Sequence, residues 1–129
     1  LAQINGAGTD SFATKHVFFN NINFGFDLTG VAPINHVTID YHEFGGVNNF
    51  SVNGGPVLEL PAMTSMPANV APGVTATVDG DSIHLSGLVS RFVIGGQELA
   101  VDNIVAVPEP TCLAILAAGL GAGLLRRRR

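Results

Sequence analysis

The alternation of apolar and polar residues in 37–44 (VTIDYHEF) constrains the fold more than any other feature of the chain. Successive side chains of a β-strand point to opposite faces of the sheet, so alternation indicates a strand with one buried and one wet face. The apolar set is predicted to face a core: Val37, Ile39 and Tyr41. The polar set is predicted to face solvent: His36, Thr38, Asp40 and His42.

The rest of residues 1–107 also has a strand-like pattern, because Gly, Asn and Pro separate short runs rich in Val, Ile, Phe and Thr. No window in this part has a helical period. Short strands at this spacing favour an all-β fold, an antiparallel β-sandwich of jelly-roll type. The predicted strands are 16–20, 22–28, 35–43, 49–53, 57–60, 74–79, 82–86, 88–94 and 98–106.

Three segments are predicted to connect these strands. Asn53-Gly54 is a strong turn dipeptide, and Gly95-Gly96-Gln97 is predicted to be a turn before the last strand. Residues 61–73 hold three prolines and are predicted to form a surface loop. Such a loop is either a binding loop or a plain connection, and the plain connection is favoured.

The end of the chain has a different composition. Residues 111–125 carry no charge and would form a helix of about 22 Å, shorter than the roughly 30 Å hydrocarbon core of a bilayer. The four arginines that follow can reach the interface and keep their end of the segment cytoplasmic: Arg126, Arg127, Arg128 and Arg129. One short C-terminal transmembrane helix is therefore predicted. A helix packed on a soluble core is disfavoured, because residues 113–125 lack a polar face.

An extended, exposed spacer is predicted in front of this helix, since Pro110 disfavours helical backbone at Glu109 and Pro108 precedes both. The Pro-Glu-Pro spacer, the uncharged segment and the four arginines, in this order, resemble the PEP-CTERM sorting signal of exported bacterial proteins. The resemblance implies an exosortase substrate whose sorting motif is Pro108, Glu109 and Pro110. It also implies a Gram-negative host that makes exopolysaccharide. A plain tail anchor that is retained is the alternative.

The resemblance divides the chain into an ectodomain, 1–107, and a sorting signal, 108–129. It implies export, passage through the inner membrane with the C-terminus cytoplasmic, and release to the cell surface or matrix. The ectodomain is expected to be N-terminally incomplete, because an exported protein needs a signal peptide and none is seen. Residues 99–104 also resemble the last strand of exported carbohydrate-binding jelly rolls, which makes exopolysaccharide an expected partner. Segments 24–28, 37–41 and 52–54 are similar to the domains of PEP-CTERM proteins.

The net charge of residues 1–107 limits which classes of partner the chain can bind. Residues 1–107 hold two basic residues, Lys15 and Arg91, against nine acidic ones, which gives a net charge of −7. Nucleic acid is excluded as a partner, because binding it needs a basic surface. The lone cysteine, Cys112, lies in the tail, so residues 1–107 contain no disulfide.

Two sets of residues are candidates for cation binding. Asp79 and Asp81 in VDGDS are oxygen ligands that a structural calcium ion would use, although a plain β-turn is favoured for them. The resemblance to jelly rolls implies Asp102 as a further calcium ligand. His36, Asp40 and His42 suit a transition metal, but residues two apart on a strand lie about 7 Å apart. Only Asp40 and His42 could therefore share one ion, and a solvated face is favoured.

Catalysis is not predicted, because no G-x-S-x-G nucleophile elbow is present. A secreted hydrolase is retained only as the least favoured function. Carbohydrate binding is the main alternative to a structural role, although the chain has no Trp and only one Tyr to stack on sugar rings. The function expected from the sequence is therefore that of an exported surface or matrix protein, with no cofactor other than calcium.

Overall fold

The structure is a computed structural model that describes residues 2–5 and 16–109. These residues form strands almost throughout, with one short 3₁₀ helix. The elements are β1 (Ala2–Asn5), β2 (His16–Phe19), β3 (Ile22–Asp27), β4 (Ile34–Glu43), β5 (Asn48–Val52), β6 (Leu58–Leu60), η1 (Met63–Ser65), β7 (Asn69–Ala71), β8 (Val74–Asp79), β9 (Ser82–Val89), β10 (Arg91–Gly96) and β11 (Leu99–Pro108).

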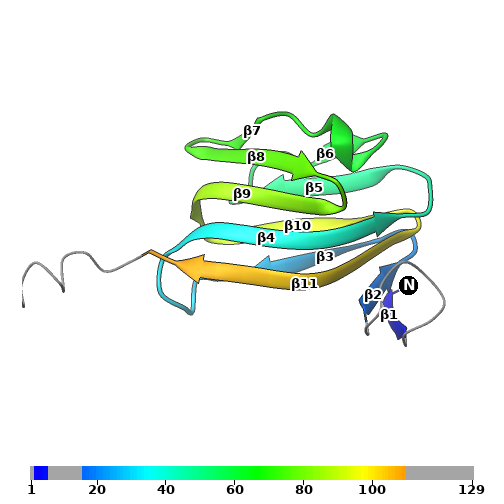
Figure 1. The fold of residues 1–129 in the computed structure, drawn as a ribbon, viewed down its shortest axis with the longest axis horizontal. Helices are drawn as coiled ribbons and strands as arrows, with labels where there is room; N and C mark the ends of the chain where they lie inside the picture. Colours follow the sequence, from blue (N-terminus) through cyan, green and yellow to red (C-terminus); the bar gives the residue numbers. More distant parts are fainter. Residues whose placement is uncertain (1, 6–15, 110–129) are drawn as a thin grey trace, which may run out of the picture.

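The strands form two antiparallel sheets that pack as a sandwich. The large sheet has the order β1-β2-β11-β4-β9-β8-β7, and the small sheet has the order β3-β10-β5-β6. In Figure 1 the large sheet lies in front, and the strands of the small sheet run behind it. The predicted all-β sandwich is therefore confirmed.

Strand pairing in the sandwich is nested. β2 pairs with β11, β3 with β10, β4 with β9, and β5 with β6. Strands that follow one another also alternate between the sheets, since β2 and β4 belong to the large sheet and β3 and β5 to the small one. The chain thus runs out and back like one long hairpin that is folded over to bring two sheets face to face. The hairpin of β7 and β8 extends the large sheet beyond β9.

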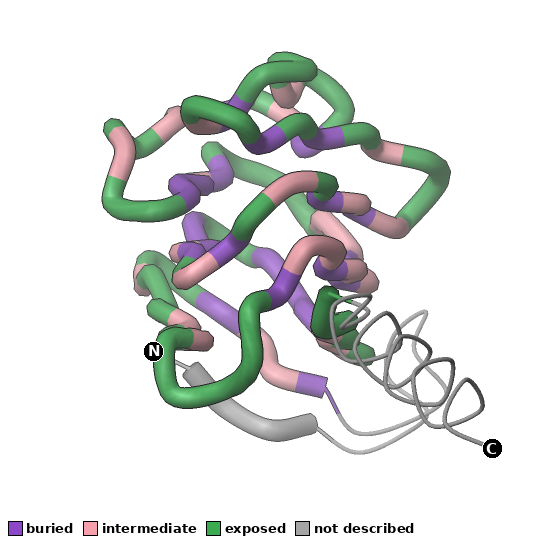
Figure 2. Tube along the Cα trace, turned by 90° about the vertical axis from the view of Figure 1, so that its left-hand side faces the viewer, coloured by how far each residue is buried: buried purple, intermediate pink, exposed green. Residues whose placement is uncertain are grey.

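The core fills the space between the sheets. The alternation predicted for β4 is confirmed, because Val37 and Ile39 are fully buried and Tyr41 is 2% exposed. The small sheet contributes Phe50 and Phe92 from the opposite side. Figure 2 shows the buried segments gathered inside the molecule and the connections exposed. Each fully buried large apolar side chain stabilises the fold by about 1.5–3 kcal/mol relative to an exposed one.

Two glycines that were predicted to form a turn before the last strand belong instead to β10. Gly95 and Gly96 lie inside β10, and the turn falls at Gln97 and Glu98. A Cβ on Gly95 would lie 2.2 Å from the carbonyl oxygen of Ile22. The predicted turn Gly95-Gly96-Gln97 is correct only at Gln97, because the two glycines allow neighbouring backbones to approach closely inside the sheet.

The segment 61–73 is more ordered than a plain loop. It contains η1 and the short edge strand β7. Met63 of η1 is fully buried, and its N–H donates a 2.8 Å hydrogen bond to Oε1 of Glu43. The side-chain amide of the buried Asn48 donates to the same oxygen. Through these two hydrogen bonds, Glu43 holds the connection 61–73 against the end of the core.

Candidate functional site

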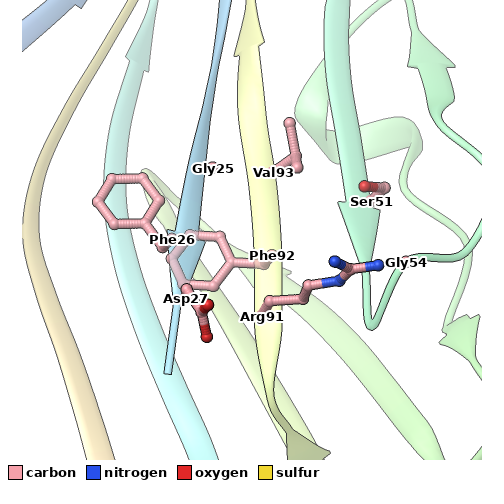
Figure 3. A pocket seen from close by; sticks show the side chains of 8 residues that line it. All are labelled: Gly25, Phe26, Asp27, Ser51, Gly54, Arg91, Phe92 and Val93. Atoms are coloured by element: carbon pink, nitrogen blue, oxygen red, sulfur yellow. The ribbon is translucent and has the colours of Figure 1, made fainter. Parts of the chain in front are cut away.

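A shallow hollow of about 430 Å³ lies on the outer face of the small sheet. Its lining residues come from three adjacent strands and the turn after β5 (Figure 3): Gly25, Phe26, Asp27, Ser51, Gly54, Arg91, Phe92 and Val93. Phe26 and Phe92 are paired across β3 and β10, and their side chains lie on the core side of the sheet. The residues on either side of them in each strand therefore point outward.

Arg91 supplies the positive charge of the hollow. Figure 3 shows its side chain running across the hollow to Gly54. A Cβ on Gly54 would lie 2.2 Å from a guanidinium nitrogen, so the bare glycine makes room for this arrangement. Arg91 is the only Lys or Arg among residues 16–109. An otherwise acidic domain thus presents a single cationic group on this face.

Asp27 pairs in register with Arg91 and lies at the same end of the hollow. The hydroxyl of Thr29 donates a 2.6 Å hydrogen bond to its carboxylate, and the N–H of Thr29 donates one of 2.9 Å. These two hydrogen bonds lower the pKa of Asp27 below its ordinary value of 3.8, and the charge of Arg91 lowers it further against the opposing effect of desolvation. Asp27 therefore stays ionised beside Arg91.

A second hollow of about 360 Å³ lies further along the same outer face and is mainly polar. Asn23 of β3 and Asn49 of β5 reach across Gly95 of β10, and the amide of Asn49 donates a 3.0 Å hydrogen bond to Oδ1 of Asn23. Glu59 of β6 is paired with Asn49 and extends this polar row. The close approach at Gly95 described above is what allows the two amides to meet.

The outer face of the small sheet thus combines amides, a serine, a guanidinium and two carboxylates over small central residues. These groups are hydrogen-bond donors and acceptors suited to a hydroxyl-rich ligand in a shallow groove. Sequence reasoning missed this face. Apolar residues alternate with polar residues or glycine in β3 and in most of β5, but this alternation does not show which strands become neighbours.

The predicted calcium ligands are placed on two parts of the large sheet. Asp79 and Asp81 flank Gly80 in the turn between β8 and β9, and the carbonyl of Asp81 accepts a 2.8 Å hydrogen bond from the N–H of Tyr41. Asp102 lies on β11, and strands β4 and β9 separate it from β8. At about 4.8 Å per strand, Asp102 lies roughly 14 Å from Asp79, which is three strands away in the same row. The three carboxylates are not brought together.

The polar face of β4 is arranged differently from the predicted set of His36, Asp40 and His42. Asp40 accepts hydrogen bonds of 2.6 Å from Ser82 and 3.2 Å from Asn103, and His42 packs edge-on against Phe44. His36 lies instead beside His84 of β9, with ring centroids 6.0 Å apart. In the part of the chain that the structure describes, no group of three or more His, Cys, Asp or Glu could hold a metal ion.

The sorting motif begins at the end of the last strand. Pro108 is the final residue of β11, and the N–H of Glu109 donates a 2.8 Å hydrogen bond to the carbonyl of Pro33. The remaining predicted parts lie outside the described residues: Pro110, the helix 111–125, and Arg126 to Arg129. Within residues 2–5 and 16–109, no helix has the length and apolar character needed to cross a bilayer.

Comparison of the chain with protein-family models, with curated proteins and with solved structures found no significant match.

Proposed function

We propose that this chain is an exported cell-surface or extracellular-matrix protein, which an exosortase sorts through residues 108–129. The observation that carries the proposal is the ordered series of a Pro-Glu-Pro motif, an uncharged segment and four arginines. The position of the motif supports it, because β11 ends at Pro108. A processing enzyme could therefore cut after the sandwich without breaking a core strand.

The exposure of the motif adds to this argument. Pro108 and Glu109 are both exposed, and only one backbone hydrogen bond joins Glu109 to the loop at Pro33. A protease needs an extended, accessible segment, and opening this contact leaves the pairing of the preceding strand intact. The segment after Pro108 would enter the inner membrane with its arginines on the cytoplasmic side.

The ectodomain in this proposal is a non-catalytic jelly roll. Support comes from the nested pairs β2–β11, β3–β10, β4–β9 and β5–β6, and from the alternation of consecutive strands between the sheets. Folding one long antiparallel hairpin over itself produces two Greek keys, which is the arrangement of a jelly roll. Its acidic character suits a surface protein.

The test is the intact mass of the protein recovered from its native cell surface and medium. A C-terminus within Pro108–Pro110 is the expected result, and a mass that includes Arg129 would show that the tail is retained as an anchor and would overturn the proposal. Replacement of the motif acid, Glu109→Ala, is expected to leave the tail in place. The matched control Glu98→Ala alters an exposed acid in the preceding turn and is expected to be processed normally.

A second candidate function for the ectodomain is carbohydrate binding on the outer face of the small sheet. The specific observation in its favour is the row of Asn23, Asn49 and Glu59, with Arg91 and Asp27 at the other end of the same face. Amides and charged groups that converge on a shallow face hydrogen-bond sugar hydroxyls, and the guanidinium pairs with an acidic sugar. Exopolysaccharide is the partner that this chemistry fits.

Titration of the ectodomain with the host polysaccharide, with and without calcium, separates carbohydrate binding from a purely structural role. Saturable binding that weakens in Arg91→Gln and in Asn49→Ala is expected. Asp79→Asn, on the turn of the large sheet, is the matched control and is expected to bind like the original chain. The absence of saturable binding in both conditions would leave the structural role. A requirement for calcium that persists in Asp79→Asn would exclude that carboxylate as a ligand.

A further inference from the structure

Two histidines from neighbouring strands lie close together on the outer face of the large sheet. His36 of β4 is in register with Ser86 of β9, and Thr38 is in register with His84. The two imidazoles are therefore diagonal neighbours on one face. Their centroids are 6.0 Å apart, and their planes differ by 26°. Each ring is partly exposed, so an ion can reach it from solvent.

The ring nitrogens of this pair converge on one oxygen. Nε2 of His36 lies 3.3 Å from the hydroxyl oxygen of Thr38, and Nδ1 of His84 lies 3.4 Å from the same atom. A hydroxyl carries one proton, so it can donate to only one of the two nitrogens at a time. The other nitrogen must use its own proton or leave a lone pair toward the shared point.

Ser86 orients the first ring. Its hydroxyl oxygen lies 3.4 Å from Nδ1 of His36, the nitrogen that points away from Thr38. When Nδ1 carries the ring proton and donates to Ser86, Nε2 keeps its lone pair toward Thr38 and His84. Metal-binding histidines are commonly oriented in this way by a partner on the second nitrogen.

We propose that His36 and His84 together bind one divalent transition-metal ion, of the Zn²⁺ or Cu²⁺ class, through Nε2 of His36 and Nδ1 of His84. Metal–nitrogen distances are about 2.0–2.1 Å, so both rings must turn toward the point between them, and the Thr38 hydroxyl must rotate away from it. The hydrogen bonds given up are long, at 3.3 and 3.4 Å. The ion gains two imidazole nitrogens, and water completes its coordination.

The surroundings favour a cation. The next row of the same sheet carries Asp102, Asp40, Ser82 and Asp79 on four adjacent strands. Asp40 is held by Ser82 and Asn103 and acts as a nearby negative charge. Imidazole ligands select transition metals over calcium, which prefers oxygen. This site differs from the predicted set, because His84 of the adjacent strand takes the place of His42.

The test is a calorimetric titration of the full chain with Zn²⁺ and with Cu²⁺. One saturable ion per chain is expected. Loss of a direct ligand in His84→Ala is expected to weaken the affinity by more than the roughly 10–100-fold that loss of a supporting partner costs. His42→Ala is the matched control, since His42 lies on the same face of β4 but packs against Phe44. It is expected to bind like the original chain.

Electron paramagnetic resonance of the Cu²⁺ complex counts the nitrogen ligands on the ion. This number would not change if the histidines had only a structural role. Two coordinated imidazole nitrogens are expected in the original chain, and one in His84→Ala. Circular dichroism checks that each variant is folded, and His84→Asn keeps a polar side chain if the alanine variant unfolds. Equal affinity in the original chain and both His84 variants would overturn the proposal, as would equal losses in the His84 and His42 variants.

Discussion

Tyr41 permits a direct test of how the core treats a titratable group. It is the only tyrosine of the chain, which also has no tryptophan, so tyrosinate absorbance reports this one phenol. The side chain is 2% exposed, and its hydroxyl donates a 3.2 Å hydrogen bond to the carbonyl of Gly80. Burial raises the pKa of Tyr41 to about 12, with further contributions from the negative charges of Glu43 and Asp81.

The shift predicts how stability depends on pH. In the unfolded chain the phenol has its ordinary pKa of about 10, so the higher pKa of the folded chain makes the stability depend on pH by an amount on the order of 2 kcal/mol. Between about pH 10 and 12 the unfolded chain releases the proton while the folded chain keeps it. The unfolded state then binds fewer protons, and the free energy of unfolding falls as the pH rises. Below about pH 10 both states keep the proton and this group contributes no pH dependence.

The assay combines tyrosinate absorbance with urea unfolding across this pH range. The free energy of unfolding of the variant Tyr41→Phe is expected to be lower by up to about 1 kcal/mol at neutral pH, because one hydrogen bond is removed. Its free energy of unfolding is also expected to fall less between about pH 10 and 12, because the phenol that causes part of that fall is absent. Other groups that titrate in this range affect both proteins alike. A phenol that titrates near its ordinary value while circular dichroism shows a folded chain would refute the reasoning, as would identical pH dependence in both proteins.

Two further predictions concern stability and are measured by urea or thermal unfolding. Gly95→Ala places a Cβ 2.2 Å from the carbonyl oxygen of Ile22 and is expected to cost about 3 kcal/mol, whereas the control Gly25→Ala meets only a side-chain atom at 3.9 Å and should cost far less. Similar losses in both variants would contradict the role of close backbone approach. Glu43→Ala leaves the buried amide of Asn48 without its acceptor and is expected to cost about 2 kcal/mol, while Glu43→Gln keeps an acceptor oxygen and should cost less. Equal stability of the two Glu43 variants would refute the role of that acceptor.

Local features of the chain were enough to predict most of the strands. The alternation in residues 37–44 identified both the strand β4 and its buried face, because the period of two is a property of a single strand. Turn dipeptides were informative for the same reason. Asn53 has a φ of 53° and Gly54 one of 73°, the left-handed backbone that this dipeptide favours.

Features that depend on which strands become neighbours were not predictable in this way. Gly95 looked like a turn residue, because its close contact is with Ile22, which is distant in the sequence. His84 was missed as the neighbour of His36 because 48 positions separate them and only the pairing of β4 with β9 brings them together. Asp102 was grouped with Asp79 on the resemblance to jelly rolls, and the strand order separates them. The predictions for Pro110 and the tail lie outside the described residues.

The position of β11 determines how this domain would resist a pull. It lies inside the large sheet between β2 and β4, and the chain leaves it at Pro108. Tension on the following segment would act along the strand, perpendicular to its hydrogen bonds, and would load them in parallel. Parallel loading requires many bonds to fail together, whereas an edge strand peeled from its end loses them one at a time. A domain pulled from Pro108 is therefore expected to resist unfolding more than one pulled from an edge strand.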